Sequence, residues 1–122
     1  MVVRSLTLHS NKRQYGPYGK EQGEKFSTSL TSGKIIGFHG RSSTFLDSIG
    51  VHLEPSHFVT LGPFGGPGGN QWDDGTYTTI RKFIISHGDT IFSIQFEYDD
   101  NGQSKWSKKH GENEGGKRDE VS

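Results

Sequence analysis

The sequence predicts an all-β protein of three related units around one axis, with one unit incomplete. Glycine is abundant, with 18 copies in 122 residues, whereas only 28% of the residues are hydrophobic. This balance favours short strands and tight turns over long helices. An aromatic residue or histidine followed by Gly-x-x-x-Gly occurs three times, at Tyr18–Gly23, Phe64–Gly69 and His110–Gly115. The final glycines follow one interval, since 69 − 23 = 46 and 115 − 69 = 46, and such a period indicates repeated structural units.

A second pattern precedes each glycine motif. Serine followed by apolar-x-apolar occurs at Ser5–Leu8, Ser48–Val51 and Ser93–Phe96. Each unit is therefore predicted to contain a strand and then a glycine-rich turn. Three units of 46 residues would need 3 × 46 = 138 residues, and the sequence has 122, so one unit is expected to be truncated.

The first half of the chain is predicted to form short strands joined by turns. Val2–His9 alternates its side chains between two faces, as a strand does. Pro17 between two glycines predicts a turn at Tyr15–Gly19, because proline fixes φ and glycine accepts a positive φ. The other predicted elements here are strands at Phe26–Leu30, Lys34–His39 and Ile49–Leu53, with a polar loop at Gly40–Asp47.

The second half contains the clearest strand, Ile91–Tyr98. Its even-numbered residues are apolar and alternate with polar residues, so they are predicted to face a core. Asn101-Gly102 suits a type I′ turn and predicts a hairpin. The other predicted elements are strands at Thr79–Ser86 and Gln103–Lys108 and a mobile charged tail at Lys109–Ser122, where apolar residues nearly vanish.

Charge and composition exclude several classes of function. The 14 basic side chains balance the 14 acidic ones, so no overall field would attract nucleic acid or an anionic membrane surface. Cysteine is absent, and the six histidines show no metal-ligand spacing. We therefore expect no cofactor and no metal. No apolar run reaches membrane-spanning length and no signal peptide is recognisable, which predicts a cytoplasmic or nuclear protein without membrane insertion.

Several blocks of the sequence together resemble the jacalin-related lectins. The matching blocks are Val3–Leu8, Tyr15–Gly19, Gly33–Ser42, Leu46–Val51, Gly62–Gly75 and Ser93–Tyr98. They extend over nearly the whole chain. The resemblance implies a β-prism I fold, in which three Greek-key sheets of four strands surround a pseudo-threefold axis. Here the third sheet is expected to be incomplete.

The order of the matching blocks is unusual. Residues 1–54 resemble the C-terminal half of such a domain, residues 58–122 resemble the N-terminal half, and residues 55–57 are the expected linker. A circular permutation or a window across two tandem lectin domains would give this order, and the tandem window is favoured because the charged tail stops in mid-pattern. In either case a hairpin expected between Ser122 and Val2 is absent. The resulting open sheet edges would invite pairing with another chain.

The resemblance also implies where a sugar would bind. The loop Ser43–Asp47 resembles the family's Gly-x-x-x-Asp sugar loop, in which Asp47 would accept hydroxyl protons and its neighbours would offer backbone N–H groups. Gly69 resembles the family's glycine contact, whose backbone can approach a sugar because it has no Cβ. The predicted carbohydrate-binding residues are Thr44, Phe45, Leu46, Asp47 and Gly69.

Two features bear on this predicted site. Ser43 stands where the family's loop begins with glycine. If that position required a positive φ, serine would cost about 1 kcal/mol of backbone strain. The other two units carry Arg4 and Phe92 in the place of Asp47, so we expect one sugar site and not three.

The resemblance implies a non-catalytic lectin that recognises terminal mannose- or glucose-type sugars, with a role in plant defence or stress. Galactose-preferring members have a chain cut at the glycine that corresponds to Gly69, and here Gly69 is internal. The expected partners are mannose- or glucose-containing glycans, and either a homo-oligomer or tandem lectin domains would supply avidity.

Two other functions remain open from the sequence. The first is an interaction or structural module that has kept the prism and lost sugar binding. The second is a glycoside hydrolase, which would need a second carboxyl group beside Asp47. The candidates for that second group, Asp73 and Asp74, precede a glycine and are predicted to belong to a turn. Trp72 is predicted to be a core residue.

Overall fold

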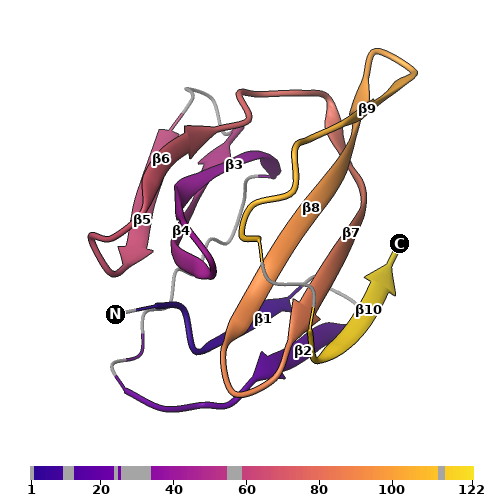
Figure 1. Ribbon diagram of the computed structural model, residues 1–122. Helices are drawn as coiled ribbons and strands as arrows, with labels where there is room; N and C mark the ends of the chain where they lie inside the picture. The colour runs from indigo at the N-terminus through magenta and orange to yellow at the C-terminus, as the bar shows by residue number, and fades with distance from the viewer. Residues whose placement is uncertain (1, 10–12, 24, 26–33, 55–58, 113–114) are drawn as a thin grey trace.

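The computed structural model describes residues 2–9, 13–23, 25, 34–54, 59–112 and 115–122, and these residues form strands and no helix (Figure 1). The strands are β1 (Ser5–His9), β2 (Gln14–Gly19), β3 (Ile35–Ser42), β4 (Leu46–Leu53), β5 (Val59–Gly65), β6 (Asn70–Asp73), β7 (Thr79–His87), β8 (Ile91–Asp100), β9 (Gln103–Trp106) and β10 (Lys117–Val121). No described segment is therefore a helix that could cross a membrane.

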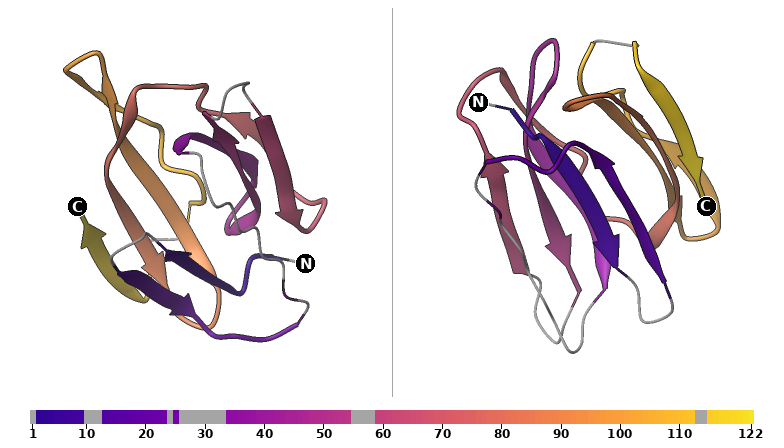
Figure 2. Two further views of the ribbon diagram at one scale, coloured as in Figure 1. Left: turned by 180° about the vertical axis from the view of Figure 1, so that it is seen from behind. Right: turned by 90° about the horizontal axis from the view of Figure 1, so that it is seen from below.

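The strands form three antiparallel sheets. Two sheets have four strands each, in the orders β5-β4-β3-β6 and β10-β7-β8-β9, and the third consists of β1 and β2. In the view from below, β1 and β2 lie between the two larger sheets (Figure 2). The predicted all-β fold is confirmed, and the third sheet has two strands among the described residues. The first sheet combines β3 and β4, which precede residues 55–57, with β5 and β6, which follow them.

The three units repeat in structure as well as in sequence. In each unit the apolar residue after the motif serine pairs with the aromatic residue or histidine of the glycine motif. The pairs are Leu6 with Tyr18, Ile49 with Phe64 and Ile94 with His110. These registers make β1, β4 and β8 equivalent strands, and they fix which residues correspond between units.

The glycine after each of these aromatic or histidine residues is required by close packing. Gly19, Gly65 and Gly111 all have a positive φ. A Cβ on any of them would collide with the carbonyl group of the residue before the motif serine, which is Arg4, Asp47 or Phe92 respectively. The backbones of paired segments thus meet in the same way three times, which explains the glycine motif.

Main-chain hydrogen bonds join the units near the centre of the molecule. Val3, Leu46 and Ile91 occupy equivalent places, two residues before the motif serines. The N–H of Val3 donates to the carbonyl of Leu46 at 2.8 Å, and the N–H of Ile91 donates to the carbonyl of Val3 at 2.9 Å. All three side chains belong to the core, in which Phe38 stacks on Phe96 with ring centroids 4.0 Å apart.

The structure confirms the strands predicted in the second half and corrects three other predictions. β7, β8 and the hairpin to β9 are present, and Asn101 and Gly102 both have the positive φ of a type I′ turn. The predicted turn at Tyr15–Gly19 is wrong, because these residues form most of strand β2. The predicted polar loop at Gly40–Asp47 shrinks to residues 43–45, since β3 and β4 extend into it.

The predicted mobile tail is the third correction. Residues Lys117–Val121 form β10, which pairs with β7 along its whole length. Main-chain pairing holds this mostly charged strand together with two side-chain contacts: His87 Nε2 lies 2.7 Å from Asp119 Oδ2, and Lys82 Nζ forms an ion pair with Glu120 Oε1 at 3.1 Å. The predicted strand Phe26–Leu30 and the predicted linker at 55–57 lie outside the described residues.

Candidate functional site

A tight turn connects β3 to β4 and carries the predicted sugar loop. The N–H of Ser43 donates to the carbonyl of Phe45 at 3.0 Å, which closes the turn. Thr44, at its tip, is exposed, and its carbonyl accepts the N–H of Glu112 at 3.0 Å. Leu46 then enters the core, so that Asp47 is fixed as the second residue of β4.

Asp47 and Gly69 lie in direct contact. Gly69 has a φ of 74°, and a Cβ built on it would lie 2.5 Å from Asp47 Oδ2 and 2.5 Å from the carbonyl oxygen of Ser42. Gly68 is next to the same carboxyl group, since its Cβ would lie 3.2 Å from Oδ1. The absence of side chains at 68 and 69 leaves backbone beside the carboxylate. Such a site can accept hydroxyl protons and offer N–H groups at the same place.

Ser43 contributes a contact of its own. Its hydroxyl donates to Asp47 Oδ2 at 3.0 Å and holds the carboxylate in place. Among the described non-glycine residues, only Asn101 has a positive φ. Ser43 therefore adopts an ordinary backbone conformation, and the strain considered for this position does not arise.

Arg41 orders the glycine loop from the neighbouring strand. Its Nε donates to the carbonyl of Gly68 at 3.2 Å, and a terminal guanidinium nitrogen donates to the carbonyl of Gly69 at 2.9 Å. Arg41 is not among the residues predicted for the site. Arg41 pairs with Gln71 on β6, and this pairing places it beside the glycine loop. A cross-strand pairing of this kind leaves no motif in the linear sequence.

The turn between β7 and β8 is a structural copy of the sugar loop. Gly88 N–H donates to the carbonyl of Thr90 at 3.0 Å, as Ser43 does to Phe45. Phe92 stands in the place of Asp47. A Cβ on Gly116 would lie 2.7 Å from the Phe92 ring, as one on Gly69 would lie against the Asp47 carboxylate. The structural counterpart of Gly69 is thus Gly116, one residue beyond the position that the 46-residue period indicates.

The copy therefore presents an aromatic ring where the first turn presents a carboxylate. The rings of Phe45 and Phe92 contact each other, with centroids 5.5 Å apart, so the two turns lie side by side. A ring cannot accept hydroxyl protons as a carboxylate does. This geometry supports the expectation of a single sugar site.

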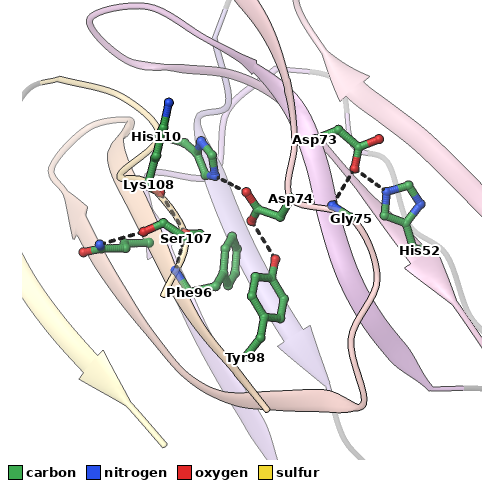
Figure 3. Close-up of polar contacts among 10 residues, drawn as sticks. His52, Asp73, Asp74, Gly75, Phe96, Tyr98, Ser107, Lys108 and His110 are labelled. Atoms are coloured by element: carbon green, nitrogen blue, oxygen red, sulfur yellow. Dashed lines mark hydrogen bonds and ion pairs between the residues drawn. The ribbon is translucent and has the colours of Figure 1, made fainter. Parts of the chain in front are cut away.

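Two neighbouring acids have different surroundings (Figure 3). Asp73 ends strand β6 and does not lie in the predicted turn; its Oδ1 lies 2.8 Å from Nε2 of His52 and accepts the N–H of Gly75 at 2.9 Å. Burial alone would raise the pKa of Asp73, but the Gly75 N–H and His52 together hold that pKa below its ordinary value. Asp73 is therefore ionised over the neutral range.

Asp74 is a buried acid that joins distant segments. Its side chain is only 7% exposed, and its carboxylate accepts the Tyr98 hydroxyl at 2.6 Å and lies 2.8 Å from Nε2 of His110. Burial, followed by the Asp74 carboxylate, raises the pKa of Tyr98. Trp72 stacks on His110 at a centroid distance of 3.4 Å and packs against the core, as predicted. In the described part of the chain, no three His, Cys, Asp or Glu side chains form a metal-binding group.

Comparisons with known proteins agree with this architecture. The family model of the jacalin-like lectin domain matches residues 1–52 and 61–122. Jacalin-related lectin 3 of Arabidopsis thaliana is 37% identical over 164 residues, which cover 90% of this chain and 27% of that protein. An agglutinin of Castanea crenata is 40% identical over 131 residues, covering 95% of this chain and 42% of that protein.

A mannose/glucose-specific lectin of Parkia platycephala is 36% identical over 99 residues, which cover 79% of this chain and 22% of that protein. The chain thus spans less than half the length of these relatives. No solved structure gives a significant match. The match of the family model over most of the sequence, together with the three-unit β fold, shows that the chain belongs to the jacalin-like lectin family.

Proposed function

We propose that the chain is a non-catalytic carbohydrate-binding module that holds one terminal mannose- or glucose-type residue beside Asp47 and Gly69. The contact between the Asp47 carboxylate and the side-chain-free backbone of Gly69 carries this proposal. Among the described side chains, only that of Ser43 donates a hydrogen bond to the Asp47 carboxylate. Oxygen lone pairs therefore remain for two hydroxyl groups of a sugar.

The surrounding turn supplies the other half of the recognition. In the proposal, backbone N–H groups of Phe45 and Leu46 donate to sugar oxygens, while Thr44 and the Phe45 ring form the rim. A carboxylate and N–H groups at fixed positions select a pair of neighbouring hydroxyl groups by their spacing. Because the turn is closed by its own hydrogen bond and braced by Glu112, little ordering is needed on binding.

The sugar class is proposed from two observations. A relative at 36% identity is named a mannose/glucose-specific lectin. Gly69 lies within the chain and does not carry a free amine. In this family, that feature favours mannose- or glucose-type sugars. The hydrolase alternative loses support, because the two candidate acids Asp73 and Asp74 are each engaged with a histidine.

We further propose that useful affinity requires several linked copies of this site. A single shallow contact with a small, strongly hydrated sugar gives weak binding, and linkage raises the effective concentration of the second site. Tandem domains or a homo-oligomer would provide it. The relatives are all more than twice as long as the matched segment, which is compatible with tandem domains.

The experiment is calorimetric titration of methyl α-mannoside into the protein and into Asp47→Asn. This substitution keeps the shape of Asp47 and removes its charge, so we expect affinity to fall by about 100-fold or more, since two charge-assisted hydrogen bonds are weakened. Asp89→Asn is the matched control, because Asp89 is exposed in the copied turn. Equal binding by the protein and Asp47→Asn would refute the assigned role. A glycan array without any signal would instead favour the interaction module.

A further inference from the structure

The sugar turn receives a hydrogen bond that departs from the threefold repeat. In the first two units, the residue after the first glycine of the motif donates its N–H to the carbonyl of the residue before the motif serine. These bonds run from Lys20 to Arg4 at 3.1 Å and from Gly66 to Asp47 at 2.8 Å. In the third unit the corresponding N–H, that of Glu112, donates to the carbonyl of Thr44 at 3.0 Å. The third unit is thereby connected to the tip of the sugar turn.

This connection fixes a peptide plane in the proposed site. A peptide group is planar, so the Thr44 carbonyl and the Phe45 N–H form one rigid unit and point in opposite directions. By holding the carbonyl, Glu112 sets the direction of the Phe45 N–H, which is one of the two proposed donors to a sugar. The orientation of this donor therefore depends on where residues 110–112 lie.

The position of Glu112 depends in turn on His110. Gly111, which lies between them, has a φ of 96°, and a Cβ there would lie 2.2 Å from the Phe92 carbonyl oxygen. This short link is thus packed against β8. His110 is only 6% exposed, and its main chain exchanges hydrogen bonds with Ile94 at 2.8 and 2.9 Å. A displacement of His110 would therefore move the Glu112 N–H.

The His110 side chain is held from the other four-stranded sheet. Its Nε2 lies 2.8 Å from Asp74 Oδ1 (Figure 3), and its ring stacks on Trp72 of β6 at a centroid distance of 3.4 Å. A carboxylate accepts hydrogen bonds, so Nε2 is the donor. The second unit has Phe64 in the place of His110, and a phenylalanine ring has no such donor. Histidine at this place adds a bond to the sheet that carries the sugar turn.

We propose that His110 is a positioning residue of the sugar site, which acts through Glu112 on the peptide between Thr44 and Phe45. The inference rests on the proposed function, since it concerns how that same site is kept ready for a sugar. The bond to Asp74 fixes the histidine ring, and the packed link carries its position to the peptide plane. Sugar affinity then depends on a buried contact outside the sugar turn, and a bound sugar stabilises the Glu112 bond in return.

The test compares two variants that each remove one partner of the same acid. His110→Phe keeps an aromatic ring and removes the Nε2 donor, whereas Tyr98→Phe removes the hydroxyl that donates to Asp74 at 2.6 Å and leaves residues 110–112 unaltered. We expect both to lower the urea midpoint by a similar amount. Only His110→Phe should weaken the binding of methyl α-mannoside, by about fivefold to tenfold, as for the loss of one hydrogen bond.

A conservative variant separates the bond to Asp74 from the packing of the ring. His110→Gln places an amide nitrogen near the Nε2 position, although it removes the ring that stacks on Trp72. It should recover most of the affinity that His110→Phe loses. Binding by His110→Gln as weak as that by His110→Phe would contradict the route through Asp74.

Amide measurements follow the brace itself. In the unchanged protein, methyl α-mannoside should slow hydrogen exchange at Glu112 and not at Lys20, the equivalent amide of the first unit. Without sugar, the NMR order parameter of the Phe45 amide should fall in His110→Phe and stay the same in Tyr98→Phe. The exchange experiment uses only the unchanged protein, so it decides the question even if His110→Phe does not fold: equal slowing at Glu112 and Lys20, or at neither, would overturn the proposal.

The outcomes also separate this proposal from the function on which it rests. Equal affinity of His110→Phe and Tyr98→Phe, or full order of the Phe45 amide in His110→Phe, would refute the role of His110 while sugar binding stands. Failure of the unchanged protein to bind the sugar would refute the proposed function. A fall in Phe45 order in His110→Phe would then still support the brace, because that measurement needs no sugar.

Discussion

One side chain distinguishes the sugar turn from its structural copy. The two turns have the same closing hydrogen bond and the same neighbouring glycine, yet Asp47 in one is replaced by Phe92 in the other. The scaffold therefore provides the shape of the turn twice, and in the proposed function the chemistry of hydroxyl recognition resides in one carboxylate. This separation of shape from chemistry is why a fold alone does not define function.

The close approach of Gly69 predicts a strong effect of a single methyl group. Gly69→Ala would place a Cβ against the Asp47 carboxylate and would also adopt a positive φ. Gly75→Ala is the matched control, because Gly75 has a φ of 84° but no atom within 4 Å of its Cβ position. Both variants should lose about 1–2 kcal/mol in unfolding free energy from backbone strain.

Only Gly69→Ala should lose more than this strain and also lose sugar binding. Urea unfolding and titration with methyl α-mannoside measure the two effects separately. Retention of full sugar affinity by Gly69→Ala would contradict the proposed role of the glycine. A similar loss of affinity in Gly75→Ala would show that backbone strain alone accounts for the effect.

At the scale of elements, the strands that bury apolar residues could be predicted, as could the exposed strand β9 through its Asn-Gly turn, whereas β2 and β10 could not. β7 and β8 alternate apolar and polar side chains, and that pattern is local. β2 contains Gly16 and Pro17, which indicate a turn, but an edge strand tolerates proline. β10 is mostly charged, and its pairing with β7 depends on residues 30 or more positions away, which no local pattern contains.

The charged strand β10 predicts unequal effects of its two acids. Asp119 is partly buried against His87, with a side chain 31% exposed, whereas Glu120 is 50% exposed. Asp119→Ala should lower the unfolding free energy by up to about 1 kcal/mol and Glu120→Ala by a few tenths. Chemical denaturation measures both. If the segment were mobile, as its composition suggests, neither substitution would change stability.

At the scale of the whole molecule, the sequence repeat predicted three units, and it did so because each glycine motif serves one local packing requirement. The contact between Asp47 and Gly69 could be anticipated only through family resemblance. Asp74 could not be anticipated, because its partners Tyr98 and His110 lie 24 and 36 residues away. They belong to β8 and to the segment that follows β9, so this acid joins the two four-stranded sheets after β6 (Figure 3).

Substitutions at two adjacent residues can measure how much this junction contributes to the free energy of unfolding. Asp74→Ala leaves a buried tyrosine hydroxyl and a buried histidine without their acceptor, so we expect a loss of about 3–5 kcal/mol in unfolding free energy. Asp73→Ala removes a carboxylate that is 55% exposed, and should cost about 1 kcal/mol or less. Urea unfolding at neutral pH compares them. Similar losses in the two variants would show that the sheets are held together by apolar packing alone, with Asp74 contributing no more than a surface acid.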